Sequence, residues 1–156
     1  MTTNEPTKTL NVLLVGGGGR EHALAEAIAA SPRLGTLYAS HAENPGIAAV
    51  ATPAGVPIEA SQAYRAELFC RDHDVDLVVI GPEAPLAAGL ADALRAKGVA
   101  VFGPGKDGAQ LEADKQWAKD LMRGAAVPTA DSKSFTDAEQ AVQYALSRHE
   151  PPVIKA

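Results

Sequence analysis

Residues 12–24 read VLLVGGGGREHAL and join an apolar run to a helix-forming segment through four consecutive glycines. The apolar residues of the stretch 10–15 are typical of a strand that is covered on both faces of a parallel sheet. Apolar residues then recur at helical spacing between residues 20 and 30, before Ser31-Pro32 ends the helix. These residues are Ala23, Leu24, Ala27 and Ile28. The sequence therefore predicts one β-α unit with a glycine turn between its strand and its helix.

The glycine turn predicts an anion site. Glycines let the backbone adopt positive φ and leave no Cβ in the way of a ligand. The first turn of the following helix adds N–H groups and the positive end of the helix dipole. We therefore expect a sugar phosphate at residues 16–21, with Arg20 as a planar donor and Glu21 in the first helical turn. On the glycines alone, a turn that serves only close helix–strand packing is the alternative.

A dinucleotide is a second candidate for the ligand, because G-x-G-x-x-G after a strand is the usual dinucleotide fingerprint. Gly16 and Gly18 fit its first two glycines, but the third position is Glu21. Glu43 lies close to the spacing expected for a ribose-binding acid. A non-catalytic Rossmann-like nucleotide-binding module that uses Glu43 is therefore the alternative function, and the missing third glycine argues against it.

The composition favours a layered α/β fold and excludes several kinds of partner. Apolar residues make up 46% of the 156 residues and aromatic residues only 4%, so we expect a core of Ala, Val, Leu and Ile. A net charge of −5 and a pI near 5.3 argue against nucleic acid or an anionic membrane as the main partner. No stretch approaches the ~18 apolar residues of a membrane span.

Cys70 is the single cysteine, and it lies in a predicted helix beside Phe69. We expect it to be a small buried hydrophobic residue. One thiol excludes an internal disulfide and a CxxC metal site, and it favours a reducing, cytoplasmic location.

Strands and helices alternate after the first unit, which predicts a parallel, right-handed α/β sheet. Further strands are expected at residues 37–39, 76–80 and 99–102, and helices at 61–73 and about 86–97, the first of them capped by Ser61. Residues 47–58 are rich in Ala, Pro and Gly and have no assigned element.

The pattern changes after Gly105. Asp114 is the expected cap of one helix, and Thr136 with Glu139 forms a capping box before another. The expected inner faces carry Trp117, Ala118, Leu121 and Met122 in the first helix, and Ala138, Ala141, Val142, Ala145 and Leu146 in the second. Residues 153–156 begin a strand.

A strand that stops after two or three residues lacks a partner sheet, so we expect the chain to be a fragment. The expected organisation is a loose tail at residues 1–9, a complete domain at 10–105 and the opening of a second domain at 106–156.

Three loops are expected to meet beyond the carboxyl ends of the strands, where open α/β sheets bind ligands. They are residues 16–21, 41–46 and 81–85. Glu83 is held between two prolines and is a candidate acceptor for a sugar hydroxyl or an amine, with a solvated turn glutamate as the alternative. We expect His22 to pack or hydrogen-bond rather than to act in acid–base chemistry.

Six motifs follow one another along the chain. They are Gly17-Gly18-Gly19-Arg20-Glu21-His22-Ala23-Leu24, Gly81-Pro82-Glu83-Ala84-Pro85-Leu86, Phe102-Gly103-Pro104, Ala109-Gln110-Leu111-Glu112-x-x-Lys115, Pro128-Thr129-Ala130 and Val153-Ile154-Lys155-Ala156. In this order and spacing they closely resemble the amino-terminal part of the phosphoribosylamine–glycine ligases, also called glycinamide ribonucleotide synthetases, of the ATP-grasp superfamily. The resemblance covers residues 10–156, and its first two motifs together are highly specific.

The resemblance implies a Rossmann-like pre-ATP-grasp domain followed by the beginning of an ATP-grasp domain. It implies a step of purine biosynthesis in which ATP, glycine and 5-phosphoribosylamine give glycinamide ribonucleotide, ADP and phosphate through a glycyl phosphate. The protein's part is largely positioning and charge stabilisation around Mg²⁺ and the phosphates. A cytoplasmic enzyme is expected, with a monomer favoured.

The resemblance also assigns site residues. The phosphoribosylamine side is expected to use Gly17, Gly18, Gly19, Arg20, Glu21, Asn44, Pro82 and Glu83. Lys115 and Lys155 match the two lysines that reach the ATP phosphates. Neither catalytic residues nor metal ligands are expected within this chain, and the Mg²⁺ ligands are expected beyond Ala156.

Two positions depart from the family pattern. Ala42-Glu43 stands where the family usually has Pro-Gly, which brings an acid near the anion site. Asp114 replaces the usual small hydroxyl residue before Lys115, and its charge weakens the expected attraction of that lysine for phosphate.

Overall fold

The computed structural model describes residues 8–55, 58 and 62–155. It divides into two units, Met1–Ala113 and Asp114–Ala156. The elements of the first unit are β1 (Leu10–Val15), α1 (Gly19–Ala29), β2 (Leu34–Ala39), α2 (Pro45–Ala48), β3 (Thr52–Pro53), α3 (Ala63–Asp72), β4 (Leu77–Ile80), α4 (Glu83–Ala87), α5 (Leu90–Arg95), β5 (Val101–Phe102) and α6 (Lys106–Ala113). Those of the second are α7 (Lys115–Gly124) and α8 (Ala138–Leu146).

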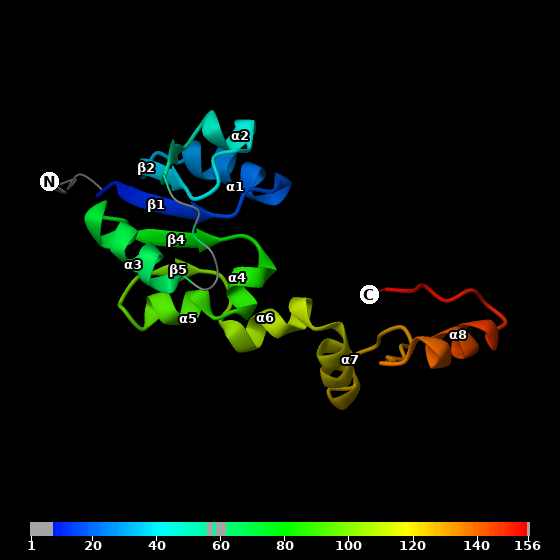
Figure 1. The fold of residues 1–156 in the computed structure, drawn as a ribbon. Helices are drawn as coiled ribbons and strands as arrows, with labels where there is room; N and C mark the ends of the chain where they lie inside the picture. Colours follow the sequence, from blue (N-terminus) through cyan, green and yellow to red (C-terminus); the bar gives the residue numbers. More distant parts are fainter. Residues whose placement is uncertain (1–7, 56–57, 59–61, 156) are drawn as a thin grey trace, which may run out of the picture. The chain divides into compact units, whose positions relative to one another are not determined.

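The strands of the first unit form one parallel sheet in the order β3-β2-β1-β4-β5 (Figure 1). The parallel α/β architecture expected from the alternating pattern is therefore confirmed. Because β1 lies between β2 and β4, the segments that follow these three strands leave the sheet at neighbouring places. This adjacency is what brings distant parts of the sequence together.

Successive residues of β1 point to opposite faces of the sheet, and each face has its own core. Leu13 and Val15 pack in a cluster with buried residues of α3, α4, α5 and α6. Val12 and Leu14 pack in a second cluster with α1 and α2. Figure 1 shows these helices on the two sides of the sheet. Ala, Val, Leu and Ile dominate both clusters, as the composition predicts.

The face of α1 that packs on the sheet begins at Glu21, two residues before the expected face. Glu21 and Ala25 are buried, and Leu24 and Ile28 are partly buried beside them. This is the spacing i, i+3, i+4, i+7 of a helix face. The expected inner residues Ala23 and Ala27 are exposed. The prediction is thus confirmed for Leu24 and Ile28 and wrong for Ala23 and Ala27, because the buried face begins at Glu21 rather than at Ala23.

Other elements differ in detail from the expected ones. The helix expected at about 86–97 is two helices, because Gly89 adopts a φ of 92° between α4 and α5. The stretch without an assigned element contains α2 and β3. The helix expected at 61–73 is α3, whereas its expected cap Ser61 lies outside the described residues.

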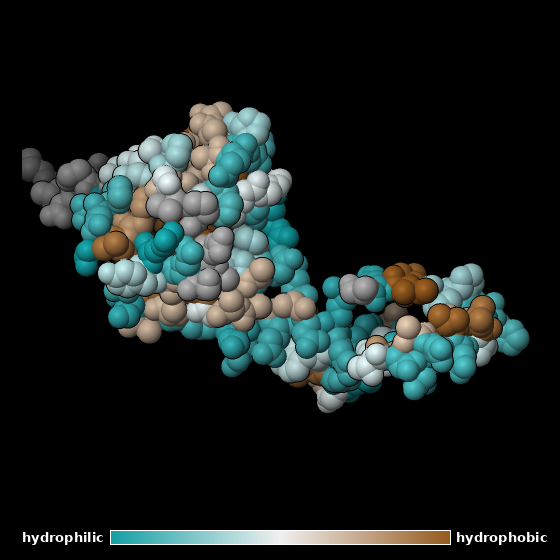
Figure 2. All heavy atoms as spheres, viewed as in Figure 1, coloured by the Kyte–Doolittle hydropathy of each residue, from teal (hydrophilic) through white to brown (hydrophobic). Residues whose placement is uncertain are grey.

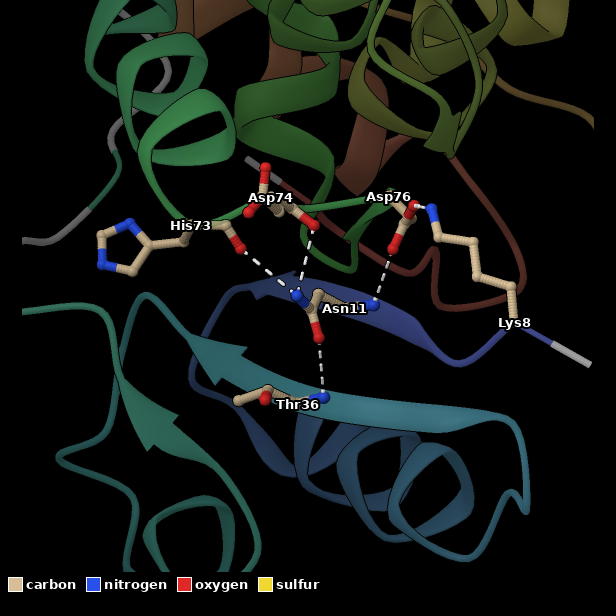
Figure 3. Close-up of polar contacts among 6 residues, drawn as sticks. All are labelled: Lys8, Asn11, Thr36, His73, Asp74 and Asp76. Atoms are coloured by element: carbon tan, nitrogen blue, oxygen red, sulfur yellow. Dashed lines mark hydrogen bonds and ion pairs between the residues drawn. The ribbon is translucent and has the colours of Figure 1, made fainter. Parts of the chain in front are cut away.

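Hydrogen bonds of Asn11 connect β1 to β2 and to the residues before β4 (Figure 3). Its Nδ2 donates to the backbone carbonyl oxygens of His73 and Asp74, each at 3.3 Å. Its Oδ1 accepts from the Thr36 N–H at 3.0 Å. Asp76 accepts from the Asn11 N–H at 2.9 Å and also pairs with Lys8. One polar side chain in an apolar strand thus joins β1 to the start of β2 and to the turn before β4.

The first unit includes α6, whereas the sequence-based boundary lies after Gly105. Ala109 of α6 is buried in the larger core cluster. The Lys106 N–H donates to Asp92 Oδ2 at 2.7 Å, which ties the start of α6 to α5. These contacts explain why the division falls after Ala113.

The second unit has helices where the sequence predicts them but little buried surface. Asp114 caps α7 as expected, and Asp137, rather than Thr136, caps α8. Figure 2 shows apolar side chains on the surface of this unit. Val142 and Leu146, expected to face inward, are 57% and 81% exposed, because no described residue of this unit covers them. Residues 151–155 form no strand in the described structure.

Candidate functional site

Three segments meet at the carboxyl edge of the sheet, where open α/β folds bind their ligands. They are residues 16–21 after β1, 40–44 after β2 and 81–83 after β4, and we call them together the rim. All residues that the sequence assigns to the phosphoribosylamine side lie on the rim. The structure therefore brings together motifs that are far apart in the sequence.

The backbone of the glycine turn is held from β2. Gly16 has a φ of 117°, a conformation that favours glycine. Its N–H donates to Ser40 Oγ at 3.2 Å, and that hydroxyl lies 2.7 Å from His41 Nδ1. Ser40 is buried. Sequence reasoning did not select Ser40, although a hydroxyl residue at the end of the neighbouring strand was the available signal.

Glu21 is turned into the protein. The residue is 5% exposed, and its Oε2 accepts from the Gly18 N–H at 2.7 Å. The carboxylate also lies against Gly81, where a Cβ would overlap Oε1. This differs from the expected substrate contact, because the helix face that packs on the sheet begins at this residue. The protein's own carboxylate thus occupies part of the anion site expected at residues 16–21.

The open part of the glycine turn is at Gly19 and Arg20. A Cβ built on Gly19 would meet nothing within 4 Å. In the part of the chain that the structure describes, the N–H groups of Gly19 and Arg20 have no acceptor within hydrogen-bond geometry. As the first residues of α1, they carry the positive end of the helix dipole. Gly18, Gly19 and Arg20 are the exposed residues of the turn, and Glu21 takes the Gly18 N–H, so the N–H groups of Gly19 and Arg20 remain as donors on its exposed part.

Arg20 connects the glycine turn to the segment after β4. Its Nη1 donates to the Gly81 carbonyl oxygen at 3.1 Å, and its Nη2 lies 3.7 Å from Glu83 Oε2. Both charged side chains remain about half exposed, at 59% and 48%. Pro82 is the N-cap of α4, and Glu83 is the first residue of that helix. The arrangement presents a cation and a carboxylate to solvent beside the open amides.

Asn44 holds two backbone segments together. Its Nδ2 donates to the Gly17 carbonyl oxygen at 3.0 Å, and its Oδ1 accepts from the Gly46 N–H at 3.0 Å as the cap of α2. The His22 ring packs against Gly46, where a Cβ would overlap it, and lies 3.3 Å from Glu26. Packing was the role expected for His22, and the structure confirms it. Asn44 therefore supports the backbone of the glycine turn through its hydrogen bond to Gly17.

The two lysines assigned to ATP belong to the second unit. Lys115 is the first residue of α7, and both it and Lys155 are exposed. The Asp114 carboxylate accepts from the Trp117 N–H at 2.9 Å, so this acid serves as a helix cap. Among the described residues, no three His, Cys, Asp or Glu side chains are placed to hold a metal ion.

Two further observations concern residues away from the rim. Cys70 is buried, as expected, and burial raises the pKa of its thiol to about 11. Of the helices in the described ranges, none is long and apolar enough to cross a membrane.

The sequence matches a known family over most of its length. The family model described as phosphoribosylglycinamide synthetase, N domain, matches residues 10–112. The phosphoribosylamine--glycine ligases of Rhizobium meliloti (strain 1021) and Agrobacterium fabrum are each 50% identical to the chain over 147 residues. The ligase of Yersinia pestis is 42% identical over the same length. Each match covers 94% of this chain and 34% of the relative, so the chain spans about a third of the length of these ligases.

Solved structures share the fold at low sequence identity. The biotin carboxylase domain of a single-chain bacterial carboxylase superposes with a TM-score of 0.59 at 19% identity, over 87% of this chain and 34% of that chain. N5-carboxyaminoimidazole synthetase from Staphylococcus aureus, complexed with ADP, gives 0.52 at 18% identity, over 91% and 38%. These likenesses concern the fold alone, and they agree with the fold class expected from the sequence.

Proposed function

The chain belongs to the phosphoribosylglycinamide synthetase N-domain family, and we propose that it is the amino-terminal part of a ligase that joins glycine to 5-phosphoribosylamine with ATP. In the proposed reaction, the glycine carboxylate takes the γ-phosphoryl group of ATP, and ADP leaves. The amine of phosphoribosylamine then attacks the carbonyl carbon of glycyl phosphate, and phosphate leaves with the formation of glycinamide ribonucleotide. Phosphoryl and acyl transfer of this kind depend mainly on positioning and charge stabilisation.

We assign the rim to phosphoribosylamine. The observation that carries this assignment is Arg20, which lies beside two open amides and reaches the segment after β4. A guanidinium has five N–H donors, and a phosphate accepts hydrogen bonds from such a donor and from helix N-terminal amides. Glu83 is exposed on the same rim and supplies an acceptor for a ribose hydroxyl or for the amine.

Supporting residues surround these contacts. Asn44 and Ser40 fix the backbone of the glycine turn, and Pro82 starts the helix that carries Glu83. Gly17, Gly18 and Gly19 keep the turn free of side chains. We propose that Lys115 and Lys155 approach the ATP phosphates, since both ammonium groups are exposed. The proposed enzyme uses Mg²⁺, which supplies charge stabilisation at the phosphates when it is bound.

The dinucleotide alternative receives no support from the geometry of the rim. A dinucleotide fingerprint needs glycine where this chain has Glu21. The Glu21 carboxylate takes the Gly18 N–H, which lies where a pyrophosphate would accept hydrogen bonds. Glu43, the proposed ribose acid, is exposed. We therefore retain the ligase proposal alone.

A chimera tests the proposal. Residues 10–112 of this chain replace the matching residues of the Rhizobium meliloti ligase, and formation of glycinamide ribonucleotide is measured. We expect ligation, and we expect Arg20→Met in the chimera to raise the KM for phosphoribosylamine while leaving the KM for ATP unchanged. Arg33→Met is the matched control, because Arg33 is exposed away from the rim. A folded but inactive chimera, or a change in the KM for ATP only, contradicts the assignment.

We further propose that the 156 residues alone do not catalyse the ligation. The chain is incubated with ATP, glycine and phosphoribosylamine, and ADP release is followed. ADP release that depends on all three substrates would contradict this part of the proposal.

A further inference from the structure

Glu21 is a buried carboxylate between two of the rim segments. It is one of only two buried polar or charged residues in the described structure, the other being Ser40. Its Oε2 accepts from the Gly18 N–H at 2.7 Å, and its Oε1 lies against Gly81. Burial of a carboxylate is costly unless hydrogen bonds compensate it. The Gly18 amide supplies such a bond, so the side chain and the glycine turn depend on each other.

The glycines on both sides of the carboxylate accommodate it. A Cβ built on Gly16 would lie 2.7 Å from Glu21 Cγ, and a Cβ built on Gly81 would overlap the carboxylate itself. Gly16 requires glycine for its positive φ as well, whereas Gly81 does not adopt a positive φ. The absence of a side chain at Gly81 is therefore explained by the Glu21 side chain. Glu21 thus occupies a slot that spans from β1 to the end of β4.

We infer that Glu21 is a positioning residue, which fixes the glycine turn against the segment after β4 and does not itself contact the substrate. The inference rests on the proposed function of the rim. Glu83 is the carboxylate that faces solvent there, with 48% of its side chain exposed. By holding Gly18 next to Gly81, Glu21 sets the separation between the open amides and Glu83 before a ligand arrives. Such preorganisation improves binding because less ordering is needed on association.

Two substitutions at Glu21 separate its hydrogen bond from its charge. Glu21→Gln keeps the shape and one acceptor oxygen, whereas Glu21→Ala removes the acceptor. In ¹⁵N-labelled full chain, we expect Glu21→Ala to shift the Gly18 amide resonance and to speed its hydrogen exchange at least about tenfold. Glu21→Gln is expected to stay close to the wild type. Glu26→Gln, on the exposed side of the same helix, is the matched control.

Ribose 5-phosphate serves as the ligand probe. We expect Glu21→Ala to weaken its binding by about tenfold and Glu21→Gln by less than about threefold, since the donor to the carboxylate keeps an acceptor. Equal weakening in both variants would mean that the charge itself contacts the ligand, and this result would overturn the inference. An unchanged Gly18 amide in Glu21→Ala would overturn it as well.

A second route covers the case in which Glu21→Ala does not fold. Gly81→Ala crowds the carboxylate from the opposite side while residue 21 is still a glutamate. We expect it to shift the Gly18 amide resonance, although residue 81 is far from Gly18 in the sequence, and an unaffected Gly18 would contradict the inference. If the wild-type chain does not bind ribose 5-phosphate, the proposed function fails, while the Gly18 measurements still decide whether Glu21 holds the turn.

Discussion

Arg20 Nη1 donates a hydrogen bond to the Gly81 carbonyl oxygen at 3.1 Å, across 61 positions of the sequence. The bond joins the first turn of α1 to the segment that precedes α4. Beneath it, the buried Glu21 joins the same two segments through Gly18 and Gly81. Neighbouring residues of one helical turn therefore have separate tasks, because Arg20 faces solvent and Glu21 faces the core.

The contact between Glu21 and Gly81 predicts a coupling in stability. We expect Gly81→Ala to destabilise the chain by about 1–3 kcal/mol, because its Cβ intrudes on a packed, buried side chain. In a Glu21→Ala background, we expect Gly81→Ala to lower the free energy of unfolding much less, because the carboxylate that its Cβ would contact is absent. Urea denaturation followed by circular dichroism of the four proteins measures the coupling. Additive free energies of unfolding would refute it.

Gly19→Ala separates ligand access from stability. A Cβ at residue 19 meets nothing within 4 Å, and Ala is a better helix former than Gly, so we expect unfolding free energy to stay constant or to rise slightly. The new methyl group stands beside the open amides, and we expect weaker binding of ribose 5-phosphate. Calorimetry of both proteins tests this split. A lower free energy of unfolding together with unchanged binding of ribose 5-phosphate would contradict this prediction.

Asp76 predicts a dependence of stability on pH. A hydrogen bond from Lys8, together with one from the Asn11 N–H, lowers the pKa of Asp76 below its ordinary value of 3.8 (Figure 3). The folded chain therefore binds this proton less tightly than the unfolded chain. The resulting stabilisation is present above the ordinary pKa and is lost as the pH falls through the lowered pKa.

Asp76→Asn tests the dependence, since it removes the titrating group and keeps its shape. We expect the variant to be less stable than the wild type at neutral pH and the difference to shrink as the pH falls below 3.8. Asp74→Asn is the control, because Asp74 is exposed and Asn tolerates its φ of 49°. Urea denaturation over a pH series gives the comparison. A difference that is independent of pH would argue that the Asp76 charge contributes nothing.

Cys70 is expected to be unreactive in the folded chain. Burial raises the pKa of its thiol to about 11, so very little thiolate is present near neutral pH, and the sulfur is also inaccessible. We expect slow reaction with Ellman's reagent in buffer and rapid, stoichiometric reaction in urea. Rapid reaction of the folded chain would show that α3 does not protect the thiol.

The sequence was sufficient to predict four of the five strands of the sheet, all except β3, and the position of the rim. Apolar runs such as β1 and β4 are typical of strands covered on both faces, and parallel order makes their carboxyl ends neighbours. The break at Gly89 was not predicted, because an isolated glycine is compatible with a continuous helix. The longer β2 was not predicted either, since its first residues depend on Asn11, which contacts them from another strand.

On the rim, the location of a residue was easier to predict than the direction of its side chain. Arg20 and Glu83 lie together on the rim, but Glu21 was expected beside them and lies beneath. Its direction depends on the rotation of α1 about its axis, and packing against the sheet sets that rotation. Ser40 was missed because a single hydroxyl residue has no spacing pattern, and only the pairing of β2 with β1 brings it to Gly16.

Titration of the ¹⁵N-labelled chain with ribose 5-phosphate tests most directly whether the rim holds a sugar phosphate. We predict saturable shifts of the Gly19 and Arg20 amide resonances at millimolar ligand, reduced in Arg20→Met and retained in Arg33→Met. Arg20→Met itself is expected to change stability by less than about 1 kcal/mol, because its ion pair is exposed. Shifts that are absent from the rim, or that are the same in Arg20→Met and the wild type, would contradict the account.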